Sequence, residues 1–183
     1  MSTRIKICGL KTRESVEAAI NSGADMLGFV FAKGSPRYIS PEEAKQLIEL
    51  IPDGIDTVAV MLNPKQREVD RVLNHIKVNY LQTDANDFDS FDIKGRTHPL
   101  KVYRDDETFD PNIMEDKPFA LFEGPMSGTG NLVNQERAKI ACDSKKVLLA
   151  GGLNIENITN VLTHVRPFGV DVSSGVEIER GIK

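Results

Sequence analysis

Eight short apolar segments recur along the chain, and each is followed by glycine, asparagine or charged residues. Several of them, such as Leu-Gly-Phe-Val-Phe and Val-Leu-Leu-Ala, are apolar almost without alternation, which is typical of strands covered on both faces by helices. We therefore expect eight parallel strands, over Ile5 to Cys8, Met26 to Phe31, Thr57 to Leu62, Tyr80 to Gln82, Leu100 to Tyr103, Phe119 to Phe122, Val147 to Ala150 and Gly169 to Val172.

Helical patterns lie between these segments, and three of them have clear starting signals. Thr12 and Asn154 each precede a helical pattern, and Ser40 is followed by Pro41 at the first turn. Such side chains accept hydrogen bonds from the free N–H groups of a first helical turn. The alternation of strands and helices predicts an α/β protein with a closed (β/α)8 TIM barrel, and an open doubly wound sheet is the alternative.

Three regions depart from a regular barrel of this kind. The segments 84–95 and 105–116 have little helical periodicity and many Asp residues, so we expect short or irregular fourth and fifth helices. Lys183 follows the eighth strand by a few residues, and we expect the final helix to be missing because the chain stops short of the encoded one. At 183 residues, a single barrel domain over 1–183 is expected.

Charge and cysteine usage exclude several classes of function. The formal net charge of -4 argues against nucleic-acid binding, and the longest apolar runs are far below the roughly 18 residues of a membrane helix. The N-terminus has no secretory pattern. Cys8, Cys142 and the three histidines lack metal-ligand spacing, so no metal is expected. We expect a reduced, cytoplasmic protein, either a monomer or a homodimer.

Cys8 ends the first apolar segment and is followed at once by a turn glycine, Gly9. Residues beyond the carboxyl end of a strand are held by the rigid sheet, so a nucleophile or base there is both exposed and fixed. Free cysteine is also common as a small buried hydrophobe. Cys8 alone leaves both interpretations open.

Glu123 occupies the corresponding position at the end of the sixth segment. The glycine-rich stretch 124–130 follows it and is expected to form a mobile loop that covers a ligand. The alternative for Glu123 is an ordinary exposed loop carboxylate. In one cleft, however, a thiolate can take a proton from carbon while a carboxylic acid protonates an oxygen.

Two turns after the last two strands have the composition of a phosphate site. They contain Gly151 and Gly152, and then Ser173, Ser174 and Gly175. Glycines allow backbone N–H groups to approach an anion, serine hydroxyls add donors, and barrels often bind phosphate at this place. The alternative is that the glycines only form turns.

Arg37 lies in a loop shaped by Gly34 and Pro36 after the second strand. Its guanidinium is suited to hold a carboxylate or a phosphate. A merely solvated surface arginine is the alternative. Together, these residues predict proton-transfer chemistry on a small phosphorylated molecule.

Several motifs together resemble the phosphoribosylanthranilate isomerase family of tryptophan biosynthesis. They are Lys-Ile-Cys-Gly-Leu, Gly-Ala-Asp-Met-Leu-Gly-Phe-Val-Phe, Ser-Pro-Arg-Tyr-Ile-Ser, Leu-Ala-Gly-Gly-Leu-Asn and Arg-Pro-Phe-Gly-Val-Asp-Val-Ser-Ser-Gly-Val-Glu, and the similarity runs from Ile5 to about Lys183. The resemblance implies a (β/α)8 barrel that converts N-(5-phosphoribosyl)anthranilate into 1-(o-carboxyphenylamino)-1-deoxyribulose 5-phosphate. This Amadori rearrangement uses no cofactor.

The resemblance also implies roles for single residues. Cys8 would be the general base that removes the C2 proton of the opened sugar imine, and Glu123 the acid that protonates the ring oxygen. Arg37 would hold the anthranilate end. The phosphate would lie at the two turns formed by Gly151, Gly152, Ser173, Ser174 and Gly175.

Two positions depart from the family pattern. Glu123 stands where the family usually has aspartate, and a histidine at the end of the fourth strand is replaced by Thr83 or Asp84, depending on the register. An acidic residue beside an anionic substrate would repel it. Two alternatives therefore stay open: a related sugar-phosphate isomerase or epimerase of changed specificity, and a non-catalytic phosphate-binding barrel.

Overall fold

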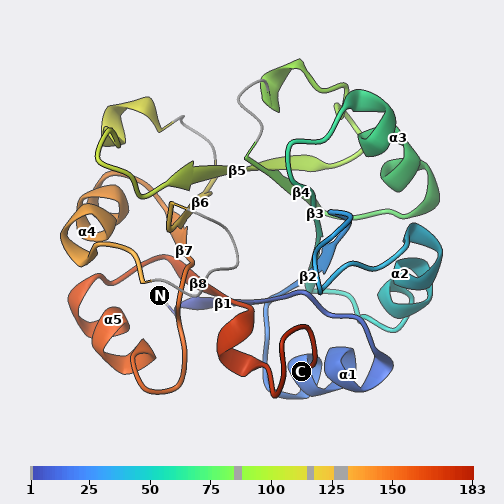
Figure 1. Ribbon diagram of the computed structural model, residues 1–183, viewed down its shortest axis with the longest axis horizontal. Helices are drawn as coiled ribbons and strands as arrows, with labels where there is room; N and C mark the ends of the chain where they lie inside the picture. Colours follow the sequence, from blue (N-terminus) through green and yellow to red (C-terminus); the bar gives the residue numbers. More distant parts are fainter. Residues whose placement is uncertain (1, 85–87, 115–117, 126–131) are drawn as a thin grey trace.

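The described residues form a closed ring of parallel strands. The structure is a computed structural model, and it describes residues 2–84, 88–114, 118–125 and 132–183. Within them eight strands pair in chain order, and β1 also pairs with β8 to close the barrel (Figure 1). The expected (β/α)8 barrel is confirmed, and the open doubly wound alternative is wrong because the sheet closes on itself.

The strands agree with the eight apolar segments, and their ends differ from the expected ones by at most two residues. They are β1 Arg4–Cys8, β2 Met26–Val30, β3 Asp56–Val60, β4 Tyr80–Thr83, β5 His98–Arg104, β6 Ala120–Glu123, β7 Val147–Leu149 and β8 Gly169–Val172.

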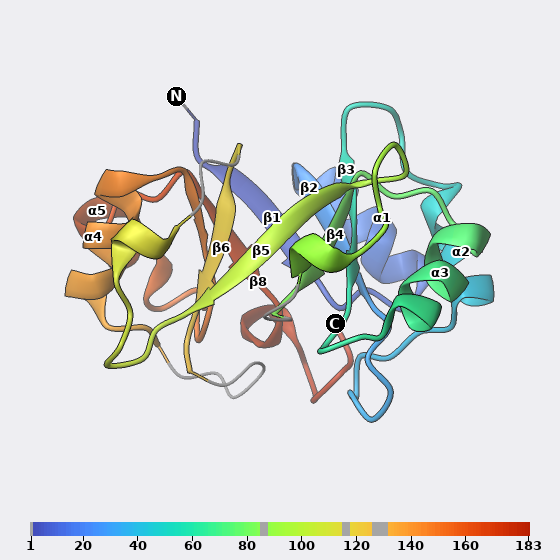
Figure 2. The same ribbon diagram turned by 90° about the horizontal axis from the view of Figure 1, so that it is seen from above.

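The helices surround the barrel on the outside (Figures 1 and 2). In the described residues they are α1 Arg13–Asn21, α2 Pro41–Ile48, α3 Gln66–His75, α4 Gln135–Ser144 and α5 Ile158–His164. None of them is long and apolar enough to cross a membrane.

The expected helix starts at Thr12 and Ser40 are confirmed, since both side chains cap their helices in capping boxes. The start expected at Asn154 is wrong, because α5 begins only at Ile158. The Asn154 side chain instead accepts hydrogen bonds from the N–H groups of Glu156 and Asn157, 2.9 and 3.1 Å away. Such local bonds stabilise a turn as readily as a helix.

The crossovers after β4 and β5 contain only single 3₁₀ turns in the described residues, η1 Phe88–Ser90 and η2 Pro111–Ile113. This agrees with the irregular fourth and fifth helices that were expected, although 85–87 and 115–117 lie outside the described residues. After β8 comes a further 3₁₀ turn, η3 Ser174–Val176.

Side chains alternate between the two faces of the barrel wall. Met26, Leu100 and Leu121 belong to one buried cluster, whereas Leu27 and Phe29 belong to another that packs beneath the helices. The alternation continues to the carboxyl ends of the strands, where polar and apolar residues together line a cavity. This edge of the barrel carries the candidate site.

Candidate active site

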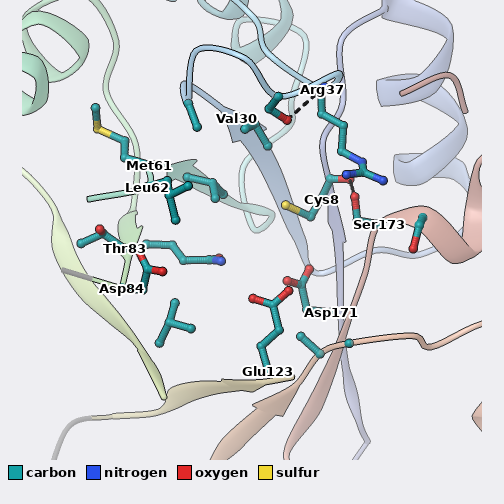
Figure 3. A pocket seen from close by; sticks show the side chains of 18 of the residues that line it. Cys8, Val30, Arg37, Met61, Leu62, Thr83, Asp84, Glu123, Asp171 and Ser173 are labelled. Atoms are coloured by element: carbon teal, nitrogen blue, oxygen red, sulfur yellow. Dashed lines mark hydrogen bonds between the residues drawn. The ribbon is translucent and has the colours of Figure 1, made fainter. Parts of the chain in front are cut away.

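A cavity of about 460 Å³ lies at the carboxyl ends of the strands (Figure 3). It brings together nearly all of the residues that the sequence singled out, from both ends of the chain. Cys8, Arg37, Glu123, Gly151, Gly152, Ser173 and Ser174 line it, and Gly175 does not. The glycine-rich loop expected to cover the ligand falls mostly on residues 126–131, which lie outside the described residues.

Cys8 points into this cavity from the end of β1 (Figure 3). Its residue is 7% exposed, so the thiol is nearly buried. Gly28 of β2 faces it, and a Cβ at Gly28 would lie only 3.0 Å from the Cys8 Sγ. The sequence analysis did not single out Gly28; its signal is a glycine in the middle of a continuous apolar strand.

An ion pair lies inside the barrel next to Cys8. Lys6 is fully buried, and its Nζ is 2.9 Å from Oδ1 of Asp171. The two residues are register partners on β1 and β8. Asp171 thereby makes a contact inside the barrel, and it also lines the cavity. Lys6 was missed, because a lysine in a strand is normally solvated.

These charges and burial together set the protonation of Cys8. Burial raises the pKa of the thiol, Lys6 and Lys183 lower it, and Asp171 and Glu123 raise it, so the pKa lies above its ordinary value. Burial opposes the charge of Lys6, but Asp171 and Cys8 outweigh this and raise the pKa of the ammonium group. In the free protein at neutral pH the thiol is therefore mainly protonated, with a fixed cation beside it to stabilise the thiolate.

Glu123 takes part in a bridge of three charged side chains. Its Oε2 lies 2.8 Å from Nη1 of Arg104, whose Nη2 lies 2.6 Å from Oδ2 of Asp84. Arg104 was missed by the sequence analysis, although a charged residue ending an apolar strand was a readable signal. It neutralises Asp84, the acidic residue expected to repel an anionic substrate.

Arg37 reaches the cavity while held by a carboxylate. Its Nε and Nη2 donate to the two oxygens of Glu177 at 2.6 and 2.9 Å. Burial raises the pKa of Glu177, but Arg37, the N–H of Gly181 and Lys183 outweigh this and lower it to about 2. The pair uses only two of the five N–H donors of a guanidinium. The remaining donors of Arg37 are able to serve a ligand.

The turns after β7 and β8 have the backbone shape of an anion site. Gly151 and Gly152 adopt positive φ values of 92° and 64°, which favour glycine. Gly175 serves the contact between the turns, since a Cβ there would meet the carbonyl oxygen of Leu153 at 1.9 Å. The Ser173 hydroxyl donates to the Cys8 carbonyl oxygen at 3.0 Å. Backbone N–H groups and Ser174 are therefore the donors left for an anion.

Further cavity residues extend the site beyond those expected. Lys33 and Arg180 add cations, and Val60, Met61, Leu62 and Val102 form an apolar wall. Among the described residues no cluster of His, Cys, Asp and Glu is arranged to hold a metal ion. The cavity thus combines a thiol, a carboxyl group, cations and an apolar wall, which suits proton transfer on an anionic molecule with an apolar part.

Comparison with known proteins gives one consistent result. A family model described as N-(5'phosphoribosyl)anthranilate (PRA) isomerase matches residues 5–183. The chain is 34% identical over 175 residues to N-(5'-phosphoribosyl)anthranilate isomerase of Streptococcus mutans, which covers 96% of this chain and 90% of that relative.

Solved structures agree with this match. The phosphoribosyl anthranilate isomerase of Thermus thermophilus has a TM-score of 0.89 and 30% identity, covering 99% of this chain and 92% of the other. A phosphoribosyl anthranilate isomerase in complex with reduced 1-(o-carboxyphenylamino)-1-deoxyribulose 5-phosphate has a TM-score of 0.82 and 30% identity. The match covers 100% of this chain and 92% of the other. This chain therefore belongs to the N-(5'-phosphoribosyl)anthranilate isomerase family.

Proposed function

We propose that Cys8 and Glu123 are the general base and the general acid with which this chain isomerises N-(5'-phosphoribosyl)anthranilate. The reaction is that of the family, an Amadori rearrangement in tryptophan biosynthesis. The observation that carries the two roles is that a thiol from β1 and a carboxyl group from β6 line one cavity. Each group is held by its strand, which general acid–base catalysis requires.

Glu123 acts first, on the ring oxygen of the ribose. It donates a proton to this oxygen while the C1–O bond breaks and the nitrogen lone pair forms the C1=N bond of an iminium ion. The carboxylate that remains pairs with Arg104, 2.8 Å away. An ion pair with low exposure stabilises this carboxylate more than water-screened charges would.

Cys8 acts second, on the C2 proton. Its thiolate takes the proton, the C2–H electron pair forms the C1=C2 bond, and the nitrogen regains its lone pair. The resulting enolamine tautomerises to the ketone, so C1 is reduced and C2 is oxidised without an outside redox partner. The Lys6 ammonium, which lowers the pKa of Cys8 against the effect of burial, raises the fraction of thiolate.

The substrate's two anionic ends are assigned to different parts of the cavity. The phosphate belongs at Gly151, Gly152, Ser173 and Ser174, where the turn shape and the backbone N–H groups suit an anion, with Gly175 holding the two turns together. The carboxylate of the anthranilate end belongs with the free donors of Arg37, and the aromatic ring with the apolar wall.

Turnover measurements on purified variants test the two roles. Cys8→Ser and Glu123→Gln should each lower kcat by at least about a hundredfold, the lower end of what acid–base groups contribute. The matched controls are Cys142→Ser, the other cysteine, and Glu49→Gln, an exposed carboxylate at the end of α2. Both controls should keep their activity.

Complementation adds a test in the cell. The chain should restore growth of a tryptophan auxotroph that lacks this step, and Cys8→Ser and Glu123→Gln should not. Wild-type kcat in either variant overturns the assigned role of that residue.

A further inference from the structure

We propose that Arg104, clamped between Asp84 and Glu123, is a positioning residue that fixes the carboxyl group of Glu123 for proton transfer. The inference rests on the proposed role of Glu123 as the general acid. It goes further because it assigns a purpose to Arg104 and Asp84, which the reaction itself does not require.

The three residues stand at the ends of neighbouring strands and alternate in charge. Glu123 ends β6, its register partner Arg104 ends β5, and Asp84 directly follows β4. Their side chains are only 16–20% exposed, so solvent screens the two ion pairs less than it screens pairs on the surface. All three line the cavity that also contains Cys8.

The geometry uses a property that arginine has and lysine lacks. The two terminal nitrogens of Arg104 contact different carboxylates, Nη1 that of Glu123 and Nη2 that of Asp84. A guanidinium is a planar fork with fixed donor directions, so a partner on one side orients the donor on the other. Asp84 therefore aims Arg104, and Arg104 in turn holds Glu123.

Glutamate at this position benefits from such support. Its side chain has one more rotatable bond than aspartate, so the carboxyl group can occupy more positions. A displacement of about 1 Å can cost roughly a hundredfold in rate. The contact with Arg104 removes that freedom at a defined oxygen, Oε2.

The carboxylate of Asp84 keeps Arg104 in place while Glu123 gains and loses its proton. While Glu123 carries its proton it is neutral, and Asp84 keeps Arg104 paired, so no part-buried cation loses its counter-charge. After Glu123 has given up the proton, its anion faces the same guanidinium. The clamp thus favours proton release toward the substrate without moving the acid.

Kinetics of three variants test the inference. Arg104→Met should lower kcat by about tenfold to a hundredfold while KM changes by less than about threefold, because positioning acts in the transition state. Asp84→Asn should lower kcat by a smaller factor. Arg104→Lys should recover only part of the loss, since one ammonium group replaces the fork.

Arg137→Met is the matched control. Arg137 forms an ion pair with Asp105, the residue next to Arg104, but Arg137 does not line the cavity. Its loss should lower the melting temperature and leave kcat unchanged. If Arg104→Met does not fold, Asp84→Asn and Arg104→Lys carry the same test, with the melting temperature measured for each.

A second arm separates positioning from a general structural effect. In a Glu123→Gln background, measured at high enzyme concentration, Arg104→Met should cause no further loss of residual activity, because the group that it positions is gone. An equal loss in both backgrounds overturns the inference. A higher KM at unchanged kcat also overturns it, because Arg104 would then bind substrate.

The same measurements distinguish this inference from the proposed function. If Glu123→Gln keeps wild-type kcat, the role of Glu123 as the acid fails, and the positioning role fails with it. If Glu123→Gln is inactive while Arg104→Met keeps wild-type kcat, only the positioning role fails.

Discussion

The reactivity of Cys8 depends on a balance between burial and four neighbouring charges. Burial, the largest influence, disfavours the thiolate, and Asp171 and Glu123 act in the same direction, while Lys6 and Lys183 oppose them. Only the thiolate reacts with an alkylating reagent. The rate of alkylation by iodoacetamide should therefore still be rising at pH 9.0, the ordinary pKa of the group.

The measurement uses a Cys142→Ser chain, so that modification reports on Cys8 alone. Mass spectrometry at a series of pH values gives the midpoint of the profile. A midpoint below 9.0 would mean that Lys6 and Lys183 outweigh burial and the two carboxylates together.

Gly28 controls the space available to the same thiol. A methyl group at this position would lie 3.0 Å from Sγ, so Cys8 would have to move by a few tenths of an ångström. Gly28→Ala should lower kcat about tenfold, given the sensitivity of catalysis to displacement of reacting groups. Unchanged kcat in a folded variant, judged by its melting temperature, would show that Sγ adapts without cost.

The sequence indicated that Cys8 and Glu123 would meet in one cavity, but it did not indicate the charged side chains around them. Cys8 and Glu123 were recognisable because each ends an apolar strand, and all strands of a parallel barrel end at the same rim. Lys6 was not, because its partner Asp171 on β8 is placed beside it only once the barrel has closed. Arg104 was overlooked, although it too ends an apolar strand, because its pairing with Asp84 depends on the register between β4 and β5. Pattern alone does not tell an inward lysine from a solvated one.

Among the helices, α2 offers a direct test of what a local signal contributes. The Ser40 hydroxyl accepts from the N–H of Glu43, whose carboxylate accepts in return from Ser40. Ser40→Ala should lower the free energy of unfolding by about 1 kcal/mol, the usual cost of losing such a cap. Urea denaturation measures it, with Ser144→Ala, at the C-terminal end of α4, as the control that should cost less.

The segment after β8 is attached to the loop between β2 and α2 through the pair of Glu177 and Arg37. Despite burial, Arg37, Gly181 and Lys183 lower the pKa of Glu177 from 4.5 to about 2. A carboxyl whose pKa is lower in the folded state binds its proton more tightly when unfolded. Its contribution to stability is full above pH 4.5 and is lost as the pH falls toward 2.

Urea denaturation between pH 2 and pH 6 checks this contribution. Glu177→Gln should be less stable at pH 6, and its unfolding free energy should fall less steeply with decreasing pH than that of the wild type. If the unfolding free energies of the two proteins fall in parallel with decreasing pH, the ion pair of Glu177 does not contribute to stability as stated.

Elements were predictable where their signals are local. The eight strands follow from short apolar segments, several of them almost unbroken, and α1 and α2 from Thr12 and Ser40. The start of α5 was wrong because Asn154 caps a turn with the same side-chain bonds that would cap a helix. A capping side chain of this kind does not distinguish a single turn from the start of a longer helix.

At the scale of the whole molecule, closure of the barrel brings the two ends of the sequence together. Lys6 and Asp171 are register partners across the seam between β1 and β8, and Lys6 has no exposed surface. Removing one member of a buried ion pair leaves the other charge uncompensated, which costs about 3–5 kcal/mol. Lys6→Met should therefore lower the free energy of unfolding by an amount in that range.

Replacing both Lys6 and Asp171 tests whether Lys6→Met loses stability because the Asp171 charge is left without a partner or because the attraction between the two residues is lost. Apolar replacement of a whole buried pair is often neutral, so Lys6→Met combined with Asp171→Leu should be more stable than Lys6→Met alone in urea denaturation. A double variant that costs the sum of the two single changes would mean that the attraction itself holds the seam closed. Recovery in the double variant, accompanied by lost turnover, would show that the pair is kept beside Cys8 for its charge rather than for folding.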